Sequence, residues 1–151
     1  MSTILDYPRP MTTAPPPPTP VQLMDGLARA AAAYYRHFAE VAAEQGLTLM
    51  QGKVLSLLRR PMPMRTLAEL LACDASNVTG ITDRLEARGL VRRAVDQADR
   101  RVKNVLLTEE GERTVALIRA ELMSGLTTLG QLDEDERRTL HGLLGRVFPQ
   151  A

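Results

Sequence analysis

The sequence predicts a mainly helical fold that contains one small β-hairpin. Of its 151 residues, 44% are hydrophobic but only 3% are aromatic, so aliphatic residues that favour helices make up the apolar content. Apolar residues recur at three- and four-residue steps along most of the chain, while one stretch is rich in β-branched residues. The length is sufficient for one core, which indicates one domain per subunit.

The first 20 residues contain seven of the ten prolines, including the run 15–18. Proline cannot continue a helix or a central strand, so we expect residues 1–20 to form a disordered or polyproline-II arm. From Val21 onward, apolar residues at helical spacing, among them Leu27, Tyr34 and Phe38, predict one long helix over 21–45 that ends near Gly46.

Two capping boxes predict the next two helices. Thr48 and Gln51 open a second helix that runs to about Leu58, and Thr66 and Glu69 open a short third helix. Pro61 and Pro63 separate the two helices.

A fourth helix is predicted to begin at the N-cap Asp74 and to end at Gly89. Val78, Ile81 and Leu85 follow one another at i, i+3 and i+7, so they form its buried stripe. The face opposite this stripe carries small, polar or charged residues, namely Ser76, Asn77, Thr79, Gly80, Asp83 and Arg84.

The segments 90–95 and 102–107 are predicted to pair as a hairpin around the charged turn 96–101. Thr108 then caps a fifth helix with apolar residues as far as Leu129. Asp133 and Glu136 form a capping box for a sixth and last helix.

Charge is unevenly distributed along the chain. Residues 46–108 contain eleven Arg or Lys against six Asp or Glu, whereas the two flanks together contain eight basic and twelve acidic residues. A basic centre between acidic ends indicates a polyanion-binding module carried by a scaffold that does not bind the polyanion. We therefore expect four regions, with an arm at 1–20, a scaffold helix at 21–45, a polyanion-binding domain at 46–108 and scaffold helices at 109–151.

Two short helices followed at once by a basic hairpin are the parts of a winged helix-turn-helix. The small polar residues near the start of the fourth helix suit entry into the major groove, although such residues are also common on solvated helices. The hairpin favours the DNA-binding interpretation over a solvated basic turn, because its cations repel one another unless an anion lies alongside. These cations are Arg92, Arg93, Arg100, Arg101 and Lys103, and Asp99 is placed to orient the guanidinium of Arg101.

Three segments, in this order, resemble MarR-type transcription regulators. The run "LTLMQGKVLSLL" (47–58) is similar to the family's second helix, and "SNVTGITDRLEARGLVRR" (76–93) is similar to its recognition helix and the start of its wing. The run "DQADRRVKNVLLTEEG" (96–111) resembles the wing signature, in which Asp-x-Arg is followed by a strand ending in Leu-Thr and then by Gly. Gly52 departs from the family, which often has an aromatic residue there, and this predicts either a looser second helix or a larger cavity nearby.

The resemblance implies a triangular homodimer whose first and last two helices interlock. Its two recognition helices would enter successive major grooves about 34 Å apart on a pseudo-palindrome. Arg101 would be the minor-groove arginine and Asp99 its orienting partner, with Ser76, Asn77, Thr79 and Arg84 as major-groove contacts. A small anionic aromatic effector would bind near Tyr35, His37, Met50, Met62 and Arg65.

This interpretation predicts a ligand-responsive repressor, and two alternatives stay open. One is a redox-sensing regulator that uses Cys73, and the other is a winged-helix module for protein contacts. No nucleophile, phosphate loop or metal-ligand pattern predicts an enzyme, a metal site or a cofactor. The single cysteine and the lack of a signal peptide or a long apolar segment predict a cytoplasmic protein without a membrane span.

Overall fold

A computed structural model describes residues 15–96 and 99–149, and the chain divides into two compact units, 1–32 and 33–151. Helix α1 (Pro20–Glu44) crosses the boundary between the units. Its start is fixed by reciprocal hydrogen bonds, because Gln22 N donates to Thr19 Oγ1 at 3.3 Å and Thr19 N donates to Gln22 Oε1 at 2.8 Å. Residues 15–19 have no regular secondary structure, and the rest of the predicted arm lies outside the described residues.

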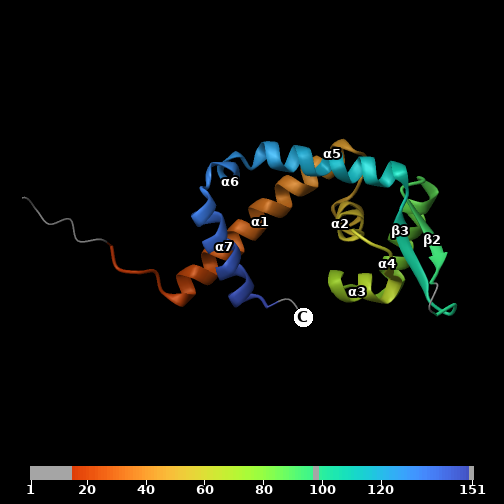
Figure 1. Cartoon of the computed structure of the whole chain (residues 1–151), viewed down its shortest axis with the longest axis horizontal. Helices are drawn as coiled ribbons and strands as arrows, with labels where there is room; N and C mark the ends of the chain where they lie inside the picture. Colours follow the sequence, from red (N-terminus) through yellow and green to blue (C-terminus); the bar gives the residue numbers. More distant parts are fainter. Residues whose placement is uncertain (1–14, 97–98, 150–151) are drawn as a thin grey trace, which may run out of the picture. The chain divides into compact units, whose positions relative to one another are not determined.

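The second unit contains the end of α1 and all other elements (Figure 1). These are α2 (Leu49–Leu57), β1 (Met62–Pro63), α3 (Met64–Leu71), α4 (Ala75–Ala87), β2 (Val91–Val95), β3 (Lys103–Leu107), α5 (Glu109–Gly125), α6 (Thr127–Gln131) and α7 (Glu134–Val147). The mainly helical class, the helix pair and the hairpin are all confirmed.

The described part has seven helices where the sequence predicts six. The predicted fifth helix ends at Gly125, because Leu126 leaves the helical conformation at φ −101° and ψ 46°, and α6 follows as a separate short helix. The apolar spacing continues across this break, so the periodicity does not reveal it.

A second correction concerns the start of α3. This helix begins at Met64 with Pro63 at the N-cap, so Thr66 lies inside the helix and forms no capping box with Glu69. Glu69 instead accepts a hydrogen bond from Arg65 Nε at 2.9 Å. Proline at the N-cap has a suitable fixed φ, so the N-cap lies three residues, almost one helical turn, before the one that the sequence predicts.

The sheet has three antiparallel strands in the order β1-β3-β2. The hairpin register pairs Val91 with Leu107 and Val95 with Lys103. The two-residue strand β1, which the sequence does not predict, pairs Met62 with Val105 and Pro63 with Asn104. Proline is tolerated there because β1 is at the sheet edge.

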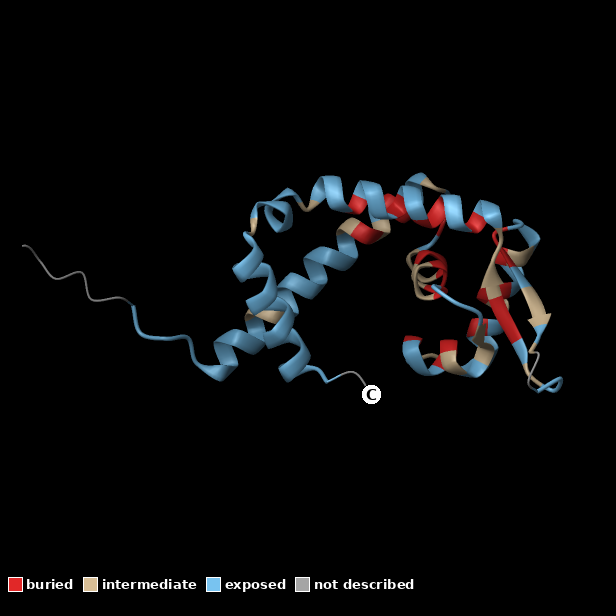
Figure 2. Cartoon of the chain, in the orientation of Figure 1, coloured by how far each residue is buried: buried red, intermediate tan, exposed pale blue. Residues whose placement is uncertain are grey.

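The core lies where α2, α3 and α4 meet the sheet and the first part of α5 (Figure 2). The predicted stripe of α4 is confirmed, since Val78, Ile81 and Leu85 are all buried. Phe38 is also buried and packs directly over Gly52, where an added Cβ would lie 2.8 Å from the Phe38 ring. The expected enlargement of a cavity at Gly52 is therefore wrong, because the Phe38 ring occupies that space.

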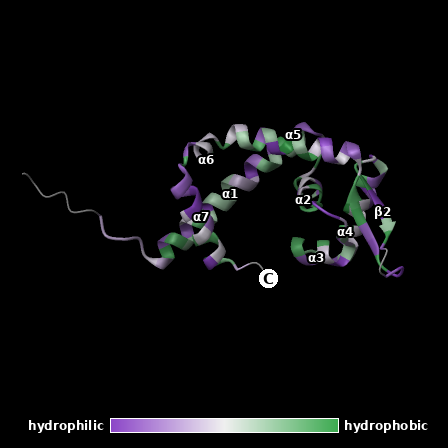
Figure 3. Ribbon diagram, in the orientation of Figure 1, coloured by the Kyte–Doolittle hydropathy of each residue, from purple (hydrophilic) through white to green (hydrophobic). Residues whose placement is uncertain are grey.

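Helix α7 contains no buried residue (Figure 2). Its start agrees with the prediction, since Glu136 N donates to Asp133 Oδ1 at 2.8 Å and Asp133 N donates to Glu136 Oε2. Hydrophobic and hydrophilic residues mix along this helix (Figure 3), and its large apolar side chains are exposed. Among the described residues, no helix is both long and apolar enough to cross a membrane.

Candidate nucleic-acid interface

The turn between α3 and α4 positions the second helix. Ala72 adopts the left-handed conformation at φ 49°, and Cys73 N donates to Ala68 O at 3.1 Å, which closes the end of α3. Asp74 then stands at the N-cap of α4 in an extended conformation, although its side chain makes no capping hydrogen bond. Because the apolar stripe of α4 is buried against the core, its opposite face is directed to solvent.

That outer face of α4 carries every residue that the sequence assigns to it. Ser76, Asn77, Thr79 and Arg84 are exposed. The Thr79 hydroxyl donates to Ala75 O at 2.8 Å, which leaves its oxygen available as an acceptor. Around Gly80, a Cβ would meet no atom within 4 Å, so this point of the helix is open to close approach.

The wing tip is held by its acidic residues through the backbone. Asp99 Oδ1 accepts a hydrogen bond from Arg101 N at 2.9 Å, and Asp99 N donates to Asp96 Oδ1 at 3.1 Å. Asn104 Nδ2 in turn donates to Asp96 Oδ2 at 2.6 Å. The expectation that Asp99 pairs with the guanidinium of Arg101 is corrected, because the hydrogen bond goes to the Arg101 amide and shapes the turn.

The predicted cations of the interface fall into two groups. In the described part of the chain, Arg84, Arg92, Arg100, Arg101 and Lys103 are exposed and form no ion pair with another described residue. Figure 3 shows that the end of the hairpin is hydrophilic. Free cations on a protruding hairpin are suited to bind an external anion.

Arg93 differs from these five cations. Its side chain is 25% exposed, and its Nη2 lies 2.6 Å from Asp83 Oδ1 on α4. A second pair joins Arg93 Nη1 to Glu86 Oε2, and Arg93 N donates to Glu86 Oε1 at 3.1 Å. The structure thus places Arg93 in a connection between β2 and α4, where two carboxylates already occupy its guanidinium.

The five residues predicted to bind an effector are not gathered around one described cavity. Lys53 Nζ lies 4.5 Å from the centroid of the Tyr35 ring, and the imidazole of His37 packs against Gly125. Met50 and Met62 pack on the hydrophobic core. Arg65 lines a cavity beside the start of β3, near the wing tip, together with Arg101 and Lys103.

Tyr34 and Cys73 are two further side chains whose surroundings affect their chemistry, the first through ionisation and the second through oxidation. The pKa of Tyr34 is raised above its ordinary value, chiefly because its phenol is partly buried and to a smaller extent because Tyr35 is close by. The phenol therefore stays protonated over a wider pH range. The thiol of Cys73 is half-buried and donates a hydrogen bond to Leu71 O at 3.3 Å.

A helix pair with a polar outer face, followed by a hairpin with several exposed cations, defines a winged helix-turn-helix DNA-binding protein. The model of the MarR family matches residues 47–103. The chain is 34% identical to the HTH-type transcriptional repressor NicR of Pseudomonas putida over 77% of each chain. It is 28% identical to the HTH-type transcriptional regulator PecS of Dickeya dadantii, covering 85% of this chain and 81% of PecS.

Solved structures agree with these matches. The structure of CouR from Rhodococcus jostii RHA1 bound to p-coumaroyl-CoA has a TM-score of 0.70 and 26% identity, and the match covers 85% of this chain and 94% of CouR. The chain belongs to the MarR family of transcriptional regulators.

Proposed function

We propose that the chain is a homodimeric repressor that binds a pseudo-palindromic operator and releases it when a small molecule binds. One observation carries this proposal. The polar face of α4 and the cations of the wing are both exposed, and they belong to the same compact unit. The similarity to the repressor NicR supports repression as the direction of control.

Each part of the interface has a proposed role. The outer face of α4 reads base edges in the major groove, where short polar side chains and an open glycine permit close approach. This set consists of Ser76, Asn77, Thr79, Gly80 and Arg84. Arg101 enters the minor groove, whose negative potential attracts a guanidinium, while Arg92, Arg100 and Lys103 bind phosphates.

The dimer is proposed from the exposed apolar face of α7. Leu140, Leu143, Leu144 and Val147 recur at i, i+3, i+4 and i+7, and all four are 40% exposed or more. A contiguous apolar helix face of this kind favours burial against another helix. A second copy of the chain supplies the same face, and two recognition helices match a two-fold symmetric operator.

Release by a small molecule is supported by the CouR structure, which contains p-coumaroyl-CoA. An effector lowers DNA affinity only if it binds the DNA-free conformation more tightly than the DNA-bound one.

The proposal is tested by selecting bound fragments from genomic DNA and measuring affinity for a selected duplex over a salt series. We expect a two-fold symmetric site and a steep linear fall of log K with log salt concentration, as phosphate neutralisation requires. A protein that is monomeric and does not bind duplex DNA at low ionic strength would contradict the proposal.

The two alternative functions have less support. A protein-docking helix would present an apolar surface, whereas the outer face of α4 is polar. A redox sensor needs an accessible thiolate, whereas the thiol of Cys73 is half-buried and hydrogen-bonded to a carbonyl.

A further inference from the structure

Arg88 joins the ends of two helices that are far apart in the sequence. It is the C-cap residue of α4, and it is exposed. Its Nη1 donates a hydrogen bond to Gly46 O at 2.7 Å, and its Nη2 donates one to Gln45 O at 3.0 Å. Both carbonyls belong to the turn directly after α1. One guanidinium therefore holds the end of α4 against the end of α1.

Both helices end in the same kind of turn, which a glycine in the left-handed region closes. After α1, Gly46 has a φ of 66° and its N donates to Ala43 O at 2.8 Å. After α4, Gly89 has a φ of 70° and its N donates to Glu86 O at 2.9 Å. Such turns fix the direction in which the chain leaves a helix. The backbone on each side of the Arg88 contact is therefore held by its own hydrogen bonds.

The charge of Arg88 suits this position. The C-terminal end of an α-helix carries about half of a negative elementary charge, because its last carbonyls have no partner within the helix. Two such ends repel each other when they lie close together, and a cation between them offsets this repulsion. Arg88 supplies the cation, and its planar group offers separate donors to the two carbonyls.

Apolar packing also connects the two helices, but it constrains them less. Phe38 and Val41 of α1 and Leu85 of α4 belong to one hydrophobic core. Apolar burial is non-directional, so it holds the helices together without fixing how far one turns against the other. Within residues 15–96 and 99–149, the two bonds of Arg88 are the only side-chain hydrogen bonds that join α4 to α1 or to the turn after it.

We propose that Arg88 is a positioning residue that fixes the recognition helix α4 against the end of α1 and thereby sets the half-site spacing that the dimer accepts. This inference rests on the proposed function, in which two copies of the chain bind a two-fold symmetric operator. The sequence assigns residues 21–45 to the scaffold of that dimer. The orientation of α4 on the end of α1 then decides where each recognition helix lies relative to its counterpart in the partner subunit. Arg88 acts through the direction of α4 and not through contact with DNA.

The test compares duplexes that differ only in the distance between the two half-sites of a selected operator. Inserting or deleting one central base pair moves one half-site by about 3.4 Å and turns it by about 34° around the duplex axis. The unaltered protein should therefore bind the altered duplexes at least about tenfold more weakly than the selected one. In Arg88→Gln, α4 is free to turn with the half-site, so this spacing penalty should shrink to about threefold or less. Fluorescence anisotropy gives the affinities.

A second variant keeps the charge. Arg88→Lys leaves a cation at the two helix ends but has one donor nitrogen in place of two, so its spacing penalty should lie between those of Arg88→Gln and the unaltered protein. Chemical denaturation of both variants shows that they are folded at the temperature of the DNA titrations. An unchanged spacing penalty in both variants would overturn the inference.

A duplex with a single half-site separates positioning from direct contact with DNA. Arg88→Gln should bind this duplex as tightly as the unaltered protein does, with the same slope of log K against log salt concentration, because Arg88 neutralises no phosphate in the proposed role. A merely structural defect would lower the half-site affinity as well. Weaker half-site binding with a slope reduced by about 1 would show that Arg88 binds phosphate, and the positioning role would be wrong.

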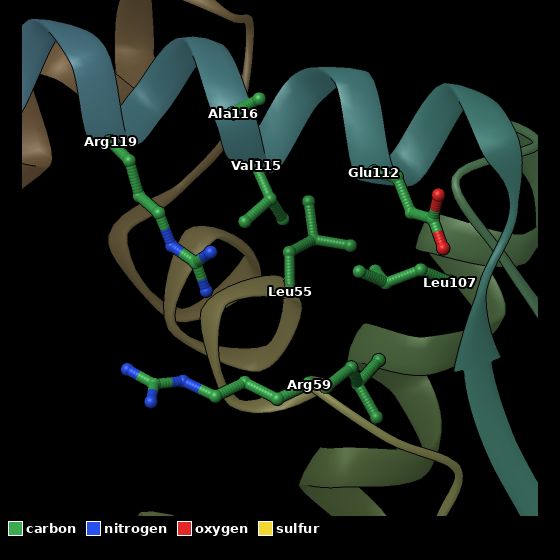
Figure 4. A pocket seen from close by; sticks show the side chains of 8 residues that line it. Leu55, Arg59, Leu107, Glu112, Val115, Ala116 and Arg119 are labelled. Atoms are coloured by element: carbon green, nitrogen blue, oxygen red, sulfur yellow. The ribbon is translucent and has the colours of Figure 1, made fainter.

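Arg59→Gln is the matched control. Arg59 lines a cavity of about 580 Å³ between α2 and α5 (Figure 4), and its side chain forms no ion pair with another described residue. The variant loses the same charge but keeps the link between α4 and the end of α1. Its spacing penalty should equal that of the unaltered protein. A penalty reduced as far as in Arg88→Gln would point to net charge and would overturn the role of Arg88.

Failure of this inference and failure of the proposed function give different results. If the unaltered protein does not bind the symmetric duplex, the proposed function is contradicted. If it binds with a strong spacing preference that both Arg88 variants retain, only the role of Arg88 is overturned. Equal binding of all spacings by the unaltered protein would also overturn that role, because no fixed arrangement of the recognition helices would exist.

Discussion

Among the individual residues, Arg101 combines a fixed backbone with a side chain that forms no ion pair with any residue that the structure describes. Its amide is held by Asp99 at 2.9 Å, and the turn around it is closed by the hydrogen bond from Val102 N to Asp99 O, also at 2.9 Å. A backbone that is fixed before binding limits the entropy lost when the guanidinium binds DNA. The acidic residues of the tip thus act through geometry, since they shape the turn that presents a cation.

Arg101→Ala should weaken binding to a selected operator by about 1 to 3 kcal/mol and reduce its sequence preference. The side chain would no longer reach the narrow groove, while the turn itself would remain because Asp99 bonds to the backbone. Fluorescence anisotropy with the selected duplex gives the affinity. Arg113→Ala is the matched control, because hydrogen bonds to Glu110 and Glu109 raise the pKa of Arg113 and occupy its guanidinium. A loss below about 0.5 kcal/mol for Arg101→Ala would contradict the wing assignment.

Arg92 and Arg93 are adjacent in sequence, yet the structure separates their roles. Arg93→Ala should weaken DNA binding, because Arg93 connects β2 to α4. It should not change the slope of log K against log salt concentration, because the charge of Arg93 already pairs with Asp83 and Glu86 and displaces no counterions from DNA. Arg92→Ala should reduce the slope by about 1, as a phosphate contact does. Measuring log K against log salt concentration for both variants separates the two roles. Equal slope changes in the two variants would show that Arg93 also binds phosphate.

At the scale of the elements, Gly80 lies in the interior of α4 although glycine weakens a helix. Gly80→Ala should stabilise the fold by about 0.5 to 1 kcal/mol, because the added methyl meets no atom of the protein within 4 Å. The same methyl should weaken DNA binding if the helix approaches the duplex closely there. Chemical denaturation and DNA titration measure the two effects. Gly142→Ala in α7, which is equally unobstructed, should be stabilising with no effect on DNA affinity, and the same result for Gly80→Ala would remove Gly80 from the interface.

Gly111 is required for the junction between the wing and α5. An added Cβ would lie 2.0 Å from Leu90 O, and that carbonyl already accepts the hydrogen bond from Thr108 N. Gly111→Ala must therefore shift backbone, and we expect a loss of about 1 to 3 kcal/mol in the free energy of unfolding. The midpoint of denaturation checks this expectation. An unchanged midpoint would mean that the junction is not held as tightly as the hydrogen bonds indicate.

The elements that the sequence predicts well are those with a local signal. Helical apolar spacing and side-chain caps at Thr48 and Asp133 locate α2 and α7, since both signals depend on neighbours within four residues. Strand β1 escapes prediction because two residues have no periodicity, and their pairing partner is about forty residues away. The Arg93 ion pairs also escape prediction, although Glu86 and Asp83 are only seven and ten residues away, because they depend on how β2 packs beside α4.

For the whole molecule, the distribution of buried residues distinguishes the DNA-binding region from the last two helices, α6 and α7. The buried residues belong to the DNA-binding region, the end of α1 and α5 as far as Leu122, whereas α6 and α7 bury none. A helix with an exposed apolar face gains stability chiefly by packing, so α7 is expected to depend on a partner. The acidic and basic residues follow the same division, with the excess of cations in residues 46–108.

The dependence of α7 on a second copy can be tested with a single charge. Leu143→Asp places a carboxylate at the centre of the apolar face, where burial in a dimer would leave it without a partner. The dissociation constant of the dimer should rise at least about 100-fold, and sedimentation velocity should show monomers. Affinity for the two-fold symmetric operator should fall as well, because a monomer binds one half-site and loses the linkage between two recognition helices. Gly142→Asp adds the same charge on the opposite face of α7 and should leave the dimer intact. If Leu143→Asp also remained dimeric, the face of α7 would not be the dimer interface, and another part of the chain would have to supply the two-fold symmetry.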